Sequence, residues 1–215
     1  MIGFYDYTVI LTYISAMVSL IGITIAANGH YKMAIVCLAV SGLLDMFDGK
    51  VARTKKDRTE DAKRFGIQID SLCDIVCFGV LPIVICYSAG VRDVVGMIIL
   101  LLYGVAGLIR LAYFNVMEEK RQQETSENRK YYQGLPITSA AIALPIVYML
   151  KPLIPYDIFL VVIRIVMFAI GALFITDFKF KKPSNFVVTV LVIIVAAALI
   201  FMFTAYSHYI VAGAK

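Results

Sequence analysis

The sequence predicts an all-α protein, a polytopic bundle of transmembrane helices that forms a single domain over residues 1–215. Hydrophobic residues make up 61% of the chain and charged residues only 16%, and the mean hydropathy is +0.86. A soluble domain of this size has too little polar surface to cover so much apolar area. No Ser/Gly-rich linker and no repeat of about 20–50 residues divides the chain. The bilayer is therefore the expected solvent for one continuous bundle.

Seven apolar segments come close to the length of about 20 residues that a helix needs to cross a bilayer. They cover residues 8–27, 31–48, 67–89, 93–116, 136–151, 157–177 and 185–210. The fifth segment is short and contains Pro145, so its ends are poorly defined by hydropathy. We expect about six to eight spans, and this interpretation gives seven.

Basic residues are concentrated in alternate loops. The loops after the second, fourth and sixth segments contain Lys50, Arg53, Lys55, Lys56, Arg58, Lys63, Arg64, Lys120, Arg121, Arg129, Lys130, Lys179, Lys181 and Lys182. The other loops contain only Lys32, Arg92 and Lys151. The positive-inside rule therefore places the three basic loops and the N-terminus in the cytoplasm, and the C-terminus outside. No basic face is separable from the membrane ends, so a nucleic-acid partner is not expected.

Four aspartates lie at the ends of two neighbouring predicted helices. Asp48 lies three positions after Asp45, and Asp74 lies four positions after Asp70, so each pair shares one helix face. A short loop joins the two helices, which lets the faces meet at the cytoplasmic boundary. Each carboxylate would cost roughly 2.5–3.5 kcal/mol at mid-bilayer, and the four would repel one another.

Divalent cations are the simplest compensation for such a cluster. Oxygen ligands suit Mg²⁺ or Mn²⁺, with Ca²⁺ as a substitute in a crystal, and a pair of ions suits phosphoryl chemistry. Gly49, Ala52 and Gly66 leave room beside the acids, and Arg53 can form bidentate hydrogen bonds to a phosphate. Two other readings are ordinary solvated helix ends and a cation pathway in a small transporter, which would not require this Gly/Ala/Arg framework.

Written out, the segment is D45-x2-D48-G49-x2-A52-R53-x12-G66-x3-D70-x3-D74. It resembles the signature of the CDP-alcohol phosphatidyltransferase family, with a longer gap before Gly66. Three further runs, Asp74–Pro82, Leu108–Val116 and Gly134–Ala141, are similar to the phosphatidylserine synthase branch of that family. Cys77, Tyr113 and Thr138 depart from the usual residues of those runs, and only Leu11-Thr12 remains of an N-terminal P-N-x-L-T motif.

The resemblance implies an enzyme that transfers a phosphatidyl group from CDP-diacylglycerol to the hydroxyl of L-serine and releases CMP. Glycerol 3-phosphate or an inositol compound is the alternative acceptor. The implied site has metal ligands Asp45, Asp48, Asp70 and Asp74, with Asp74 also the catalytic base, nucleotide-binding residues Gly49, Ala52, Arg53 and Gly66, and acceptor-binding residues Arg110 and Asn115. Two divalent ions, a homodimer and a cell-membrane location with a cytoplasmic active site are also implied.

Overall fold

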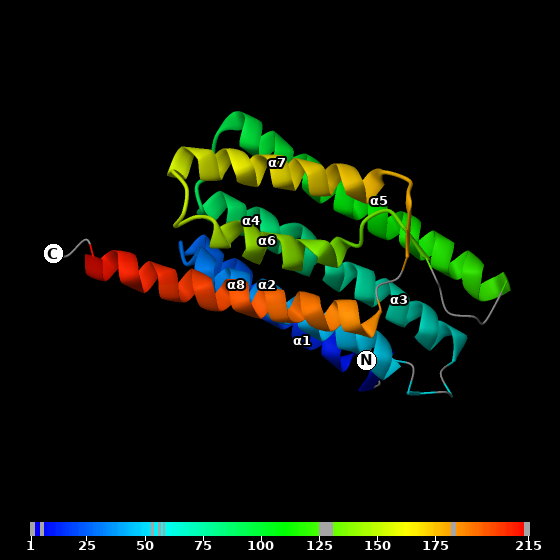
Figure 1. Ribbon diagram of the computed structural model, residues 1–215. Helices are drawn as coiled ribbons and strands as arrows, with labels where there is room; N and C mark the ends of the chain where they lie inside the picture. The colour runs from blue at the N-terminus through cyan, green and yellow to red at the C-terminus, as the bar shows by residue number, and fades with distance from the viewer. Residues whose placement is uncertain are drawn as a thin grey trace.

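The computed structural model describes residues 3–4, 7–52, 54, 55, 57, 59–124, 131–181 and 184–212, and it is a bundle of roughly parallel and antiparallel helices (Figure 1). This confirms the expected all-α class. Arg53, one of the expected nucleotide-binding residues, lies outside the described residues.

The helices follow one another along the chain with short connections. They are η1 (Tyr7–Val9), α1 (Ile10–Ala27), α2 (Tyr31–Ala52), α3 (Glu60–Asp74), η2 (Ile75–Val80), α4 (Leu81–Ser88), α5 (Val94–Glu124), η3 (Ile137–Ser139), α6 (Ala140–Met149), α7 (Tyr156–Ile175) and α8 (Asn185–Ala212). The segments η1 and η3 are 3-10 helices, and η2 is a π-helical turn that joins α3 to α4 without a break.

Two helices extend beyond the predicted spans. Helix α3 begins at Glu60, seven residues before the predicted segment, and α5 continues to Glu124. Thr59 caps α3, because its Oγ1 accepts a hydrogen bond from the amide of Ala62 at 3.2 Å, and Glu60 and Asp61 in the first turn suit the helix dipole. Hydropathy detects only the part of a helix that faces lipid, so it misses such polar extensions.

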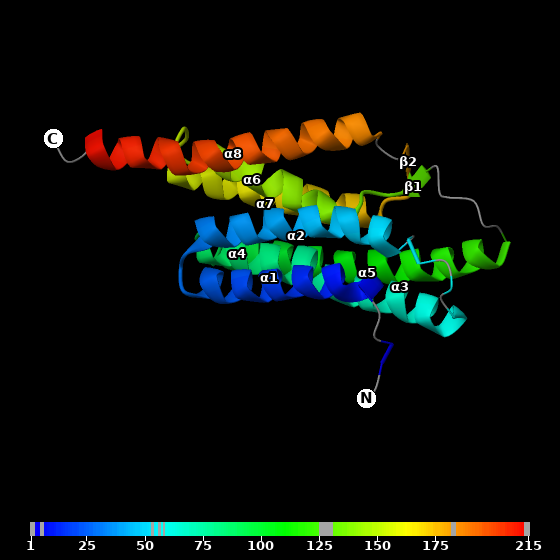
Figure 2. The ribbon, with the colours of Figure 1, turned by 90° about the horizontal axis from the view of Figure 1, so that it is seen from below.

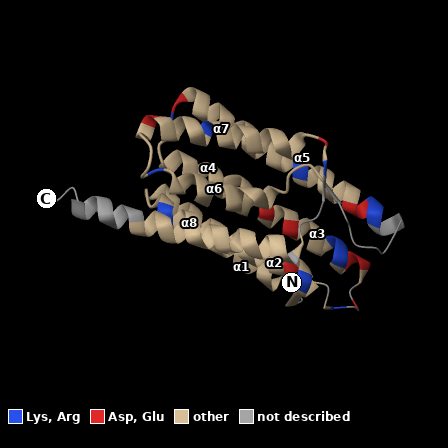
Figure 3. Cartoon of the chain, in the orientation of Figure 1, with Lys and Arg blue, Asp and Glu red and all other residues tan. Residues whose placement is uncertain are grey.

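Among the described residues, five helices are long and apolar enough to cross a membrane: Tyr7–Ala27, Glu60–Ser88, Val94–Arg121, Tyr156–Ile175 and Phe186–Thr204. Helix α2 has 22 residues but contains Lys32, Asp45, Asp48 and Lys50, while α6 has only ten residues. Most charged residues lie toward the ends of the bundle, with long uncharged stretches of helix between them (Figure 3). The chain is thus an integral membrane protein.

The bundle is built on close packing of α1 against α2 and of α5 against α7, with α4 and α6 between these pairs (Figure 1). Helix α8 lies along one outer side of the bundle (Figure 2). Large side chains from the middle helices, including Phe78, Tyr103, Tyr148 and Phe159, are fully buried. Many Leu, Ile and Val side chains point outward on α5, α7 and α8 instead. Such an apolar exterior is what a lipid-facing surface requires.

A short pair of strands, which hydropathy does not predict, joins two loops of the bundle. Strand β1 (Tyr131–Gln133) pairs antiparallel with β2 (Lys179–Lys181). Gly134 follows β1 with a φ of +65°, a conformation that suits glycine, and its amide donates to the carbonyl of Phe178 at 2.8 Å. The segment that leads into α6 is therefore fixed against the end of α7.

Candidate metal and active site

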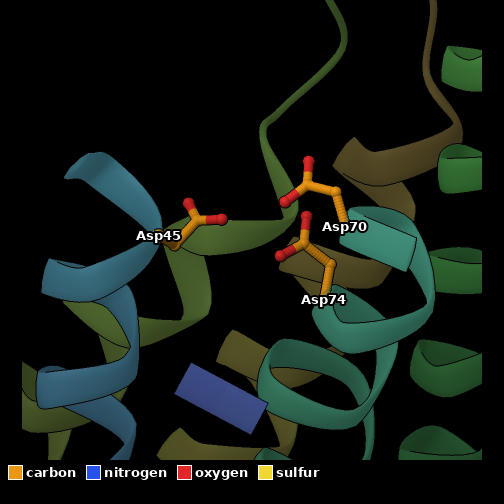
Figure 4. A group of neighbouring side chains, drawn as sticks. All are labelled: Asp45, Asp70 and Asp74. Carbon is orange, nitrogen blue, oxygen red and sulfur yellow. The ribbon is translucent and has the colours of Figure 1, made fainter. Parts of the chain in front are cut away.

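Three of the four predicted aspartates converge between two helices. Asp45 comes from α2, and Asp70 and Asp74 come from α3, with carboxyl groups that point toward one another (Figure 4). One carboxylate oxygen from each lies within 4.8 Å of the others. The spacing argument from sequence is confirmed here, because the i,i+4 pair on α3 faces the end of α2.

The fourth aspartate completes the facing arrangement. The carboxyl of Asp45 lies beside that of Asp74, and the carboxyl of Asp48 lies beside that of Asp70. Asp48 is only 8% exposed, and its Oδ2 accepts a hydrogen bond from Oγ1 of Thr12 at 3.2 Å. Each acid of α2 thus faces an acid of α3, and the two facing pairs lie one turn apart along the helices.

The donor set fits a divalent cation. Among the described residues, no ion pair connects these four carboxylates to a lysine or arginine. Clustered carboxylates with little solvent need positive charge, and their oxygens are the ligands that Mg²⁺ and Mn²⁺ prefer. The cluster can therefore hold divalent metal.

A stripe of small hydroxyl residues on η1 and α1 packs against the site, and sequence reasoning missed it. Thr8, Thr12, Ser15 and Ser19 are all buried and follow helical spacing. Ser15 Oγ donates to the carbonyl of Ser41 at 3.2 Å, and Ser19 Oγ lies 2.8 Å from Ser41 Oγ. The sequence does contain a signal for this stripe, because hydroxyl residues recur at helical spacing at positions 8, 12, 15 and 19 of an otherwise apolar span.

Thr12→Val should weaken the site without changing its shape. The variant removes the donor to Asp48, and we expect it to lower the free energy of unfolding by about 1 kcal/mol and metal affinity by about tenfold. Thermal unfolding and Mn²⁺ titration of the purified protein measure both effects. Thr24→Val on the same helix is the control, since the Thr24 side chain is exposed and, among the described residues, donates only to the carbonyl of Ile21 on its own helix. Equal behaviour of the two variants would contradict the role of Thr12.

The predicted nucleotide-binding residues flank the loop between α2 and α3. Gly49 and Ala52 lie in the last turn of α2, directly after Asp48, and Gly66 lies one turn before Asp70 on α3. These small residues therefore lie at the same end of the bundle as the acids.

The two predicted acceptor-binding residues make structural contacts on α5. Arg110 is 8% exposed, and its Nη1 donates to the carbonyl of Gln133 at 2.9 Å. Asn115 accepts from Ser71 Oγ at 2.7 Å and donates to Gln68 Oε1 at 3.2 Å. Ser71 follows Asp70 directly, so Asn115 fixes a face of α3 next to the one that carries the acids.

The segment from η3 to α6 lies beside the cluster. A Cβ added to Gly107 would lie 3.2 Å from Ile137 and 3.4 Å from Ile75, the residue after Asp74. A Cβ added to Gly42, one turn before Asp45, would lie 2.8 Å from the Cβ of Ala141. Residues 137–141 thus cross from one side of the cluster to the other. The buried hydroxyl of Ser139, on this segment, makes no hydrogen bond within the described residues.

Comparison with known proteins gives a consistent picture. The family model described as CDP-alcohol phosphatidyltransferase matches residues 7–175. The CDP-diacylglycerol–serine O-phosphatidyltransferase of Saccharomyces cerevisiae is 31% identical over 158 residues, which are 71% of this chain and 56% of the relative. The enzyme of the same name from Mycobacterium leprae is 34% identical over 135 residues, 62% of this chain and 43% of the relative.

An archaeal relative has a different printed name. The archaetidylserine synthase of Methanothermobacter thermautotrophicus is 32% identical over 145 residues, which are 65% of this chain and 56% of that protein. The chain spans about half the length of the curated relatives it matches. The matched region contains all four aspartates and the segments that surround them.

Proposed function

The chain belongs to the CDP-alcohol phosphatidyltransferase family, and we propose from this that it transfers the phosphatidyl group of CDP-diacylglycerol to the hydroxyl of L-serine. The observation that carries the proposal is the convergence of Asp45, Asp70 and Asp74 between α2 and α3. Three relatives whose printed names specify serine as the head group support the choice of acceptor. Two of these names specify a diacylglycerol donor, and the third specifies an archaetidyl lipid. The proposed donor is therefore CDP-diacylglycerol or the corresponding CDP-activated ether lipid.

Asp74 is the proposed general base. It would accept the proton of the serine hydroxyl as the serine oxygen forms a bond to the phosphatidyl phosphorus and the bond from that phosphorus to the CMP oxygen breaks. Asp45, Asp48, Asp70 and Asp74 would hold the metal. Two divalent ions, Mg²⁺ or Mn²⁺, would neutralise the diphosphate charge when bound. The reaction needs no covalent intermediate on the protein, so positioning of the two substrates is the main task of the site.

The nucleotide would bind at the rim of the cluster. Gly49, Ala52 and Gly66 carry little or no side chain, so a diphosphate and a cytosine ring can approach the helices closely there. Arg53 would contribute bidentate hydrogen bonds to phosphate. The lipid tails of the donor would remain between the helices and the bilayer.

The acceptor would bind between α5 and the 137–141 segment. Arg110 is the proposed partner for the serine carboxylate, since a guanidinium has five N–H donors and can bridge a backbone carbonyl and a carboxylate. Asn115 would support it by fixing α3 through Gln68 and Ser71. The hydroxyl of Ser139 is a buried polar group of the 137–141 segment, with no hydrogen-bond partner within the described residues.

The site is proposed to face the cytoplasm of a cell-membrane enzyme that acts as a homodimer. Support comes from the positive-inside rule, which applies to the three basic loops. The ends of α2 and α3 that carry the aspartates adjoin one of those loops. CMP and free serine are both water-soluble, so a cytoplasmic opening allows their exchange.

The purified protein in detergent should release CMP from CDP-diacylglycerol when serine and Mn²⁺ or Mg²⁺ are present. Replacing serine with glycerol 3-phosphate or inositol phosphate should leave only background release. CMP release with one of those alcohols alone would reassign the acceptor within the family. Absence of CMP with every alcohol would reject the enzymatic proposal, and metal-ion flux into proteoliposomes would then test a cation pathway.

A further inference from the structure

The π-helical turn η2 lies immediately after Asp74, and its geometry affects where that aspartate points. Asp74 is the N-cap residue of the turn, and the amide of Leu81 at its other end donates to the carbonyl of Val76, five residues back. In a π-helical turn each amide bonds the carbonyl five residues back, and not four as in the α-helices beside it. Such turns are rare overall, and those that occur often lie at functional sites. The turn therefore sets the rotation of α3 relative to α4.

Pro82 removes one backbone donor from the segment that follows this turn. In a regular α-helix the amide of residue 82 would donate to the carbonyl of residue 78, but proline has no N–H. The hydroxyl of Tyr103 on α5 donates a hydrogen bond to the carbonyl of Phe78 instead. Tyr103 thus supplies, from a separate helix, a hydrogen bond to a carbonyl of the turn just before Pro82.

Tyr103 is itself fixed by its surroundings. It is only 1% exposed, and its ring packs on Phe174 of α7 with 5.4 Å between centroids. A Cβ added to Gly171 of α7 would lie only 3.2 Å from the Cα of Tyr103. Helix α7 therefore holds the tyrosine in one position, from which its hydroxyl reaches the turn.

We propose that Tyr103 is a positioning residue for Asp74, which acts by holding η2 in its π-helical register through the carbonyl of Phe78. This inference rests on the proposed function, in which Asp74 is the base for the acceptor hydroxyl. Tyr103 does not touch the aspartates and binds neither substrate nor metal. Its hydroxyl keeps the end of α3 rotated so that Asp74 faces Asp45.

Tyr103→Phe tests the proposal, because it removes only the hydroxyl. Tyr148→Phe is a matched control: Tyr148 is also 1% exposed, and its hydroxyl donates to the carbonyl of Ile85 on α4, farther from Asp74. Both variants should lower the unfolding temperature by similar amounts. Only Tyr103→Phe should lower kcat for CMP release, by about tenfold or more, with KM for serine and for CDP-diacylglycerol unchanged.

Hydrogen exchange gives a readout that does not depend on activity. Amides in residues 75–83 should exchange faster in Tyr103→Phe than in the parent or in Tyr148→Phe. If the parent releases no CMP with any alcohol, the proposed function fails, while this measurement still tests the link between Tyr103 and η2. Unchanged exchange of this segment in Tyr103→Phe would overturn the inference, and so would equal kcat values for the two tyrosine variants.

Gly171→Ala provides a second variant in case Tyr103→Phe does not fold. The added methyl group would press on the backbone of Tyr103 and shift its hydroxyl away from the carbonyl of Phe78, although the hydroxyl itself is retained. We expect a smaller loss of kcat in the same direction, with faster exchange in residues 75–83. A stable Gly171→Ala protein with parental kcat and parental exchange would count against the proposal.

Discussion

Asp74→Asn is expected to lower kcat for CMP release by about 10²–10⁴-fold, the range that a positioned general base contributes. An amide keeps the size of the side chain and can still present an oxygen to metal, but it cannot accept the proton of the serine hydroxyl. Mn²⁺ affinity should fall only by about tenfold, the effect of one lost charge, because Asp45, Asp48 and Asp70 keep their carboxylates, so saturating Mn²⁺ still binds. Steady-state kinetics and a Mn²⁺ titration of the same preparation separate the two effects.

Asp157→Asn is the control for the loss of one acid. Asp157 is exposed in the first turn of α7 and lies outside the aspartate cluster, so its amide variant should keep parental kinetics. A purified Asp74→Asn protein with full activity would remove Asp74 as the base. A loss of activity that tracks a loss of Mn²⁺ binding would instead make Asp74 chiefly a metal ligand.

The aspartate pairs could be predicted from sequence because helical periodicity decides them locally. Asp70 and Asp74 share a face at i,i+4 spacing, and the short loop after α2 brings that face opposite Asp45 and Asp48. The helix positions followed from the length of the apolar segments in the same way. These features need only the local chain and the thickness of a bilayer.

The contacts that support the site could not be predicted, because they join residues far apart in the chain. Thr12 bonds Asp48, and Tyr103 bonds the carbonyl of Phe78, both between different helices. Hydropathy treats Tyr103 as one more apolar residue of a span. Pro82 was a usable local signal, since a proline inside an apolar helix leaves a carbonyl that needs another donor.

Arg110 shows a different limit of sequence reasoning. A lone arginine in an apolar span predicts a functional residue, since an unpaired charge in a bilayer is costly. The structure shows that its guanidinium donates to the carbonyl of Gln133, beside the positive-φ Gly134. Arg110 thus holds the last residue of β1 in place. A motif comparison alone would not reveal this structural role.

Asp45→Asn is expected to affect metal binding first and catalysis only as a consequence. Asp45 is the α2 member of the cluster and provides one of its three close carboxylate oxygens. Removing one negative charge from an oxygen-ligand site weakens its affinity for a divalent ion, and we expect the Mn²⁺ dissociation constant to rise by at least about tenfold. Activity at low Mn²⁺ should fall by a similar factor.

Excess metal should distinguish this variant from Asp74→Asn. At saturating Mn²⁺ the Asp45→Asn protein should recover much of its CMP release, since its proton acceptor is intact, whereas Asp74→Asn should remain inactive at every metal concentration. Glu60→Gln is the control at the same end of the bundle, because Glu60 is exposed and pairs only with Lys63 at 2.7 Å in the described part of the chain. Asp45 is proposed only to bind metal, whereas Asp74 also accepts the proton. The activities of the two variants must therefore depend differently on Mn²⁺ concentration. If CMP release depended on Mn²⁺ concentration in the same way in Asp45→Asn and Asp74→Asn, these separate roles would be refuted.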